Sequence, residues 1–123
     1  MAAAVNVSIV IWCDDASHPR KRSRVFVAEF TKPNIMWAPM PQKRRTPGVK
    51  WWSDRGERAH VEPDAGENAL LHHDLTCRYC KRPLTVRPGK MDAILDQIQA
   101  AGRVYVTMAE LRAILNTSGQ PRP

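Results

Sequence analysis

Two short-spaced pairs of metal-ligating side chains constrain the fold of this chain more than any other feature. Cys13 and His18 form the first pair, and Cys77 and Cys80 form the second, within a CxxC. Structural zinc prefers four Cys or His ligands at tetrahedral corners, usually supplied as two short-spaced pairs. The pattern therefore predicts one structural Zn²⁺ bound by Cys13, His18, Cys77 and Cys80. Four protein ligands leave no open position for a substrate, so this zinc would stabilise the fold without doing chemistry.

The fourth ligand and the role of the CxxC both have alternatives. His72 and His73 shortly precede Cys77, and either could replace His18; His60 is a more distant candidate. An odd number of cysteines disfavours a disulfide scaffold. A redox CxxC usually lies at a helix N-terminus, whereas a proline and β-branched residues follow this one.

Apolar and β-branched residues flank both ligand pairs and predict strands. Residues 5–12 and 25–30 would form a hairpin with the first ligand pair at its tip. Residues 69–76 lead into the CxxC and residues 81–86 leave it. Each ligand pair is therefore expected on a turn between two strands.

The last third of the chain predicts two helices. Four apolar residues within 91–98 recur at i, i+3, i+4 and i+7, and Gly102 would follow the end of that helix. Thr107 and Glu110 have the spacing of a capping box, which would begin the second helix. A DNA-binding helix-turn-helix is an alternative, but the link between these helices is longer than the usual turn. We expect the apolar stripes to pack on the sheet or on a partner.

Residues at about 31–67 are rich in proline, glycine and charge, and they predict a long insertion in one domain spanning 1–117. Three tryptophans in this insertion indicate that part of it packs, with a strand around 49–52. Residues 118–123 would form a flexible tail. The expected fold class is α+β, with a small antiparallel zinc-ribbon-like sheet and two C-terminal helices.

Charge indicates the class of partner. The chain has 19 Lys and Arg against 12 Asp and Glu, a formal net charge of +7 at pH 7, which favours polyanions or acidic protein surfaces. A solvated basic surface is the alternative. Trp51, Trp52 and Tyr79 could stack on unpaired bases, although tryptophans in small domains are more often core. The basic residues expected near the zinc, as contacts for a polyanion or partner, are Arg20, Lys21, Arg22, Arg24, Arg78, Lys81 and Arg82.

The ligands and their surroundings form a distinctive pattern: Cys13-Asp14-Asp15-x-x-His18-Pro19-Arg20, a returning strand at 25–27, a tryptophan-bearing middle, Cys77-x-x-Cys80 and a helix pair ending over 109–115. In this pattern the chain resembles a group of small zinc-ribbon-like proteins of unassigned function encoded by bacteriophages of actinobacteria. The resemblance implies a bacterial host and a bound metal, but no reaction.

We therefore expect a non-catalytic, zinc-stabilised binding module, a phage protein that interacts with a host or viral protein. The alternatives are a nucleic-acid-binding regulator that uses the basic end near the zinc, and a metal-dependent nuclease. His72-His73-Asp74 beside a metal motif suggests the nuclease, but no recognisable motif supplies a base and an open metal position. The sequence contains no run of about 18 apolar residues, which a membrane-spanning helix would need. The expected location is therefore cytoplasmic, in the host cytosol for a viral protein.

Overall fold

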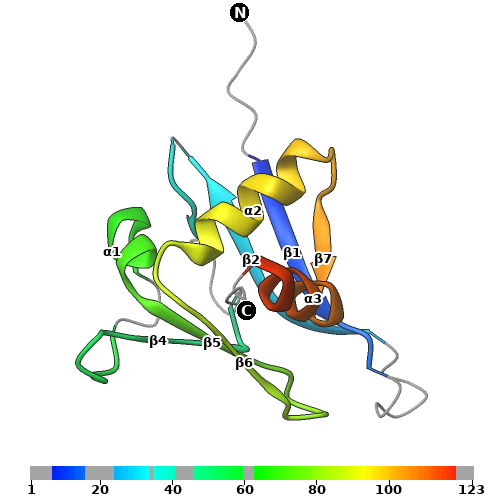
Figure 1. Ribbon diagram of the computed structural model, residues 1–123, viewed down its shortest axis with the longest axis horizontal. Coiled ribbons are helices and arrows are strands. Elements are labelled where there is room, and N and C mark those ends of the chain that lie inside the picture. The colour runs from blue at the N-terminus through cyan, green and yellow to red at the C-terminus, as the bar shows by residue number, and fades with distance from the viewer. Residues whose placement is uncertain (1–6, 16–23, 34, 41–45, 60–62, 119–123) are drawn as a thin grey trace, which may run out of the picture.

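The computed structural model describes residues 7–15, 24–33, 35–40, 46–59 and 63–118. Within them the fold is α+β, as the sequence predicts, with two sheets and three helices (Figure 1). The elements in chain order are β1 (Val7–Cys13), β2 (Val25–Lys32), β3 (Ala38–Pro39), β4 (Val49–Trp52), α1 (Ala65–Leu70), β5 (His72–Thr76), β6 (Pro83–Val86), α2 (Lys90–Ala100), β7 (Tyr105–Thr107) and α3 (Met108–Ser118).

The larger sheet has the strand order β3-β2-β1-β7. β1 and β2 pair antiparallel from Val7 opposite Lys32 to Cys13 opposite Val25, which confirms the predicted strand pairing. Residues 16–23 between these strands lie outside the described residues. β7 pairs parallel to β1, so this sheet is mixed and not purely antiparallel. β7 is distant from β1 in the sequence, so the local patterns that predict a hairpin could not predict this parallel pairing.

The smaller sheet, β4-β5-β6, is antiparallel and carries the CxxC between β5 and β6. The predicted strand at 49–52 and the predicted turn at the CxxC are both present. The expectation of extended structure from residue 69 was wrong, because α1 continues to Leu70. A capping box begins this helix: the Asp64 side chain accepts from the Glu67 N–H at 2.8 Å, and Glu67 accepts from the Asp64 N–H at 3.3 Å.

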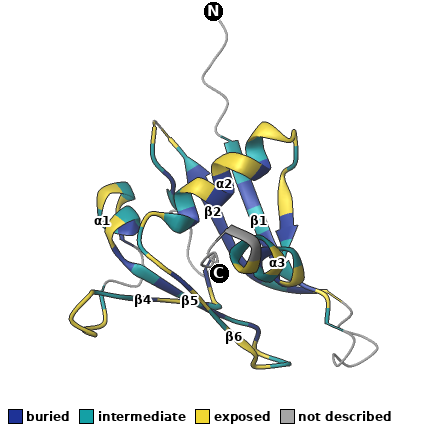
Figure 2. Cartoon of the chain, viewed as in Figure 1, coloured by how far each residue is buried: buried dark blue, intermediate teal, exposed yellow. Residues whose placement is uncertain are grey.

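The two C-terminal helices lie across one face of the larger sheet (Figure 1). Met91, Ile94, Leu95 and Ile98 of α2 are all buried, which confirms the predicted apolar stripe, and Figure 2 shows the buried residues gathered on the facing sides of sheet and helices. At the start of α3, the Glu110 N–H donates to the Thr107 hydroxyl at 3.2 Å, as the predicted capping box requires.

α3 extends to Ser118, the first residue of the predicted tail, and residues 119–123 lie outside the described residues. None of the described helices is long and apolar enough to cross a membrane.

Tryptophans of the predicted insertion are part of the core. Trp37 is fully buried and Trp51 is 1% exposed. The Asn68 side chain links the two tryptophans. Its Oδ1 accepts a hydrogen bond from Trp51 Nε1 at 2.9 Å, and its Nδ2 donates to the Trp37 carbonyl at 3.1 Å. His73 Nε2 lies 2.8 Å from the same Asn68 Oδ1, and burial lowers the pKa of His73 to about 4. The imidazole is therefore neutral at pH 7, with its proton on Nε2.

Gly48 is the point at which the two sheets touch. Its N–H donates to the Val27 carbonyl at 2.9 Å, and its carbonyl accepts from the Thr76 N–H at 2.8 Å. A Cβ at this position would lie 2.7 Å from both the Thr76 carbonyl oxygen and Val27 Cγ1. Only glycine fits this approach, which places Cys77 beside the end of β2.

Gly48→Ala is expected to lower the free energy of unfolding by about 1–3 kcal/mol, because the added methyl pushes β5 away from β2. Gly66→Ala is the matched control: its Cβ would meet only Asp64 Oδ1 at 3.4 Å, and alanine favours the α1 helix. Urea unfolding followed by circular dichroism measures both variants. Equal stability of the two variants would contradict the close contact at Gly48.

The stability of the protein is expected to fall as the pH drops from 6.5 towards 4. In this window the unfolded chain protonates His73 while the folded chain does not, so the unfolded state binds more protons and is favoured. The full effect is roughly 3 kcal/mol for a shift of this size. His73→Gln removes the titrating group and keeps a donor for Asn68.

The stability difference between wild type and His73→Gln should therefore shrink as the pH falls, measured by urea unfolding at a series of pH values. His72→Gln, which alters the half-buried neighbour, should keep the wild-type pH profile. A difference between wild type and His73→Gln that stays constant with pH would refute the assignment.

Candidate metal centre

All three cysteines of the chain converge where the two sheets meet. Cys13 is the last residue of β1, and Cys77 and Cys80 lie in the turn after β5. Their sulfur atoms all lie within 4.8 Å of one another, and Cys13 Sγ is 3.6 Å from Cys80 Sγ. Thiolates around a tetrahedral zinc, with Zn–S bonds of about 2.3 Å, are spaced about 3.8 Å apart. The three cysteines are therefore positioned to hold one metal ion.

The turn after β5 directs both of its sulfurs towards β1. The Lys81 N–H donates to the Cys77 carbonyl at 2.8 Å and closes the turn, and the Tyr79 N–H donates to Cys77 Sγ at 3.5 Å. Lys81 adopts a φ of 55°, in the left-handed region that residues other than glycine and asparagine rarely enter. This conformation lets the chain fold back into β6 immediately after Cys80.

The thiols of Cys13 and Cys77 differ in how readily they lose a proton. Burial raises the pKa of Cys13 to about 12. Burial also opposes ionisation of Cys77, but the N–H groups of Cys80 and Tyr79 and the neighbouring thiols outweigh it, so the pKa of Cys77 is lowered. Cys77 therefore loses its proton more readily than Cys13, and metal binding must displace the proton of Cys13. Buried thiolates are soft ligands that suit zinc and disfavour magnesium or calcium.

The fourth position is not supplied by any other described residue. His18 lies outside the described residues, so its role as a ligand stays a prediction. His72 Nε2 lies 2.9 Å from Asp54 Oδ1, His73 Nε2 lies 2.8 Å from Asn68 Oδ1, and neither imidazole belongs to the group of close metal-ligating atoms. Within the described residues, the metal-ligating group at this place consists of the three cysteines.

Four of the seven predicted basic contact residues are described, and all four are exposed: Arg24, Arg78, Lys81 and Arg82. Arg82 Nη1 lies 2.8 Å from Asp15 Oδ2, which links the CxxC turn to the residues after β1. The other three predicted contact residues, Arg20, Lys21 and Arg22, lie outside the described residues.

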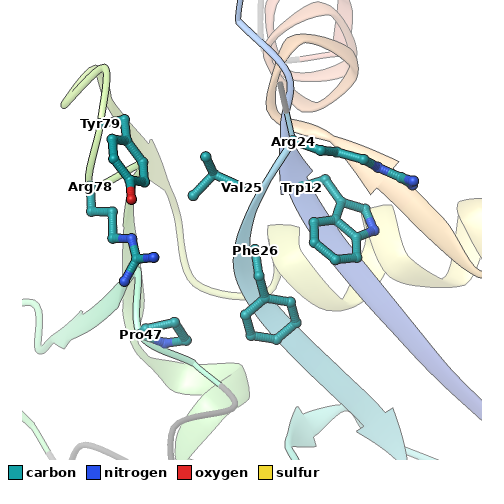
Figure 3. Close-up of a pocket in the computed structure, with 7 residues that line it drawn as sticks. All are labelled: Trp12, Arg24, Val25, Phe26, Pro47, Arg78 and Tyr79. Atoms are coloured by element: carbon teal, nitrogen blue, oxygen red, sulfur yellow. The ribbon is translucent and has the colours of Figure 1, made fainter. Parts of the chain in front are cut away.

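A cleft of about 380 Å³ adjoins the cysteines, between the CxxC turn and the ends of β1 and β2 (Figure 3). Tyr79 and Arg78 line one side, and Trp12, Phe26 and Arg24 line the other. Sequence reasoning missed Trp12 and Phe26. Alternation along β1 could have indicated Trp12, because a buried Cys13 places its neighbour on the opposite face.

Neither a family model, nor a curated protein, nor a solved structure matches this chain. The cysteine cluster and the cleft beside it are the features of this chain that bear on its function.

His18→Ala is expected to change the ligand field of the bound metal, whereas His72→Ala is not. Cobalt(II) can replace zinc and reports tetrahedral thiolate coordination through its visible absorption. The His18→Ala spectrum should shift or lose intensity, because water would replace a nitrogen ligand. An unchanged His18→Ala spectrum, or a shifted His72→Ala spectrum, would show that His18 is not the fourth ligand.

Proposed function

We propose that this protein is a non-catalytic binding module, stabilised by one structural Zn²⁺ on Cys13, Cys77, Cys80 and His18. The convergence of three thiols carries this proposal. They come from two different sheets, and two of them are buried. A metal here would join the end of β1 to the β5–β6 turn, so its binding energy would act as folding energy.

A structural role for the metal is favoured over a catalytic one. Cys13 and Cys77 are only 3% and 1% exposed, so two of the three sulfur ligands are withdrawn from solvent, as is typical of a structural site. The two neighbouring histidines, His72 and His73, are hydrogen-bonded to Asp54 and Asn68 and are not part of the cysteine group, where a base for metal-bound water would have to lie nearby.

The partner is proposed to be an anionic macromolecule of a phage or its bacterial host, contacted at the end of the domain that carries the metal. Arg24, Arg78, Lys81 and Arg82 expose positive charge there, in a chain with a formal net charge of +7. Both an acidic protein surface and a nucleic acid have the charge that this end would attract. The proposed location is the cytosol of the host cell.

Elemental analysis of the purified protein is expected to give one zinc per chain. Removal by a chelator should abolish the near-UV circular dichroism of the buried tryptophans, and added Zn²⁺, but not Mg²⁺, should restore it. Cys77→Ser should lose the zinc, and His72→Ala should retain it. A Cys77→Ser protein with one zinc, or a wild-type protein whose dichroism survives complete zinc removal, would contradict the structural metal.

A further inference from the structure

One face of the larger sheet is left uncovered by the helices and carries aromatic side chains. Ile11 and Val106 are paired neighbours on β1 and β7, and both are fully buried under the helices. Because side chains alternate along a strand, Trp12 and Tyr105 lie on the opposite face. Phe26 on β2 is paired with Trp12, and the two rings meet edge to face at 5.5 Å. Tyr105 is 42% exposed.

Arginines are interleaved with these rings. The Arg24 guanidinium lies 4.7 Å from the centre of the Trp12 ring and 5.5 Å from the centre of the Tyr105 ring. Arg78 lies 5.1 Å from the Tyr79 ring. An arginine placed over an aromatic ring keeps its N–H groups available to an anion. No ion pair among the described residues uses Arg24 or Arg78.

Tyr79 brings a further ring to the other side of the cleft. Figure 3 shows Tyr79 and Arg78 on the CxxC turn, across the cleft from the Phe26 and Trp12 rings. The volume of about 380 Å³ lies within the range of pockets that enclose small ligands, about 300–1,000 Å³. The cleft therefore offers aromatic walls with cations beside them.

We propose that this cleft binds unpaired bases of a single-stranded nucleic acid. A base would stack against Tyr79 or the Phe26–Trp12 pair, and Arg24 and Arg78 would contact the adjoining phosphates. This inference rests on the proposed function in one respect: the metal fixes the CxxC turn, and hence Tyr79, relative to β1.

The chemistry of the cleft favours this occupant over the others. Flat π-faced bases stack on aromatic side chains, and every base has such a face. An acidic protein surface would match the arginines but would leave the rings without flat partners. A base-paired duplex keeps its bases stacked and exposes phosphates instead. A second copy of this chain, docked by two-fold symmetry, would bring Arg24 and Arg78 close to their own copies.

The test uses the zinc-loaded full chain and a fluorescein-labelled oligothymidylate of about 16 nucleotides, the upper site size of common single-strand binding domains. Fluorescence anisotropy measures the affinity at several salt concentrations. We expect binding that weakens as the salt rises, because phosphate contacts release counterions. Tyr79→Leu should weaken binding about tenfold without changing the salt slope, since it removes only a stacking surface.

A matched pair of double variants separates the cleft from net charge. Arg24→Gln with Arg78→Gln should weaken binding about tenfold or more and reduce the salt slope. Arg55→Gln with Arg58→Gln makes the same charge change beyond the opposite end of β5, where Trp52 pairs with both His72 and Arg58, and should change the affinity less than about twofold. Equal losses in both double variants would overturn the proposal.

Competition identifies the kind of ligand. Unlabelled single strands should displace the probe, whereas a duplex or polyglutamate at equal charge should displace it poorly; equal displacement by either would overturn the inference. A folded, zinc-loaded protein that does not bind the probe at low salt would also overturn it, while leaving the proposed function intact. A zinc-free folded protein that binds with the expected variant effects would support the cleft and refute the structural metal.

Discussion

The close approach of β5 to β2 at Gly48 is the contact on which the rest of the structure depends. Gly48 hydrogen-bonds to Val27 of the larger sheet and to Thr76 of the smaller one, in a space that leaves no room for a Cβ. Since Cys77 directly follows Thr76, this backbone junction determines how near the CxxC comes to Cys13. The metal centre is therefore built on main-chain hydrogen bonds, and a metal would strengthen a contact that the backbone already makes.

The predicted insertion is tied to α2 through one of its tryptophans, Trp37. Trp37 is fully buried, and its Nε1 donates to Asp96 of α2 at 2.8 Å while its backbone N–H donates to Asp92 at 3.1 Å. Lys32 pairs with Asp96 at 2.7 Å, and this contact lowers the pKa of the carboxyl. A segment rich in proline is thus anchored to α2 by the polar atoms of Trp37, because buried indole N–H groups need acceptors.

Adjacent residues of β1 serve the two candidate functional features. Cys13 faces inward to the other cysteines, and Trp12 faces outward to the cleft, as the alternation of a strand requires. The CxxC turn contributes in the same way, with Cys77 and Cys80 in the cysteine cluster and Tyr79 and Arg78 on the cleft. The cysteine cluster and the cleft are therefore back to back, and any loosening of the cysteine cluster would also move Tyr79 relative to Trp12.

The sequence by itself determined the features that depend on local spacing. The β-branched runs identified β1 and β2, the apolar stripe identified α2, and the pair Thr107 and Glu110 identified the start of α3. Each of these signals lies within a few residues of the element it describes, so it can be recognised without knowing the fold. The α+β class and the grouping of Cys13 with the CxxC followed from such signals and from the preference of zinc for soft ligands.

Only the tertiary structure decided the features that depend on distant segments. These are the parallel pairing of β7 with β1, the division into two sheets joined at Gly48, the burial of His73 on Asn68, and the cleft between Trp12 and Tyr79. A glycine or a tryptophan looks the same in the sequence whether it lies at a junction, in the core or at a surface, because its surroundings come from residues far along the chain. The cysteine cluster was recognisable because the metal-binding chemistry of closely spaced cysteines is specific, whereas the cleft exists only where the two sheets are brought together.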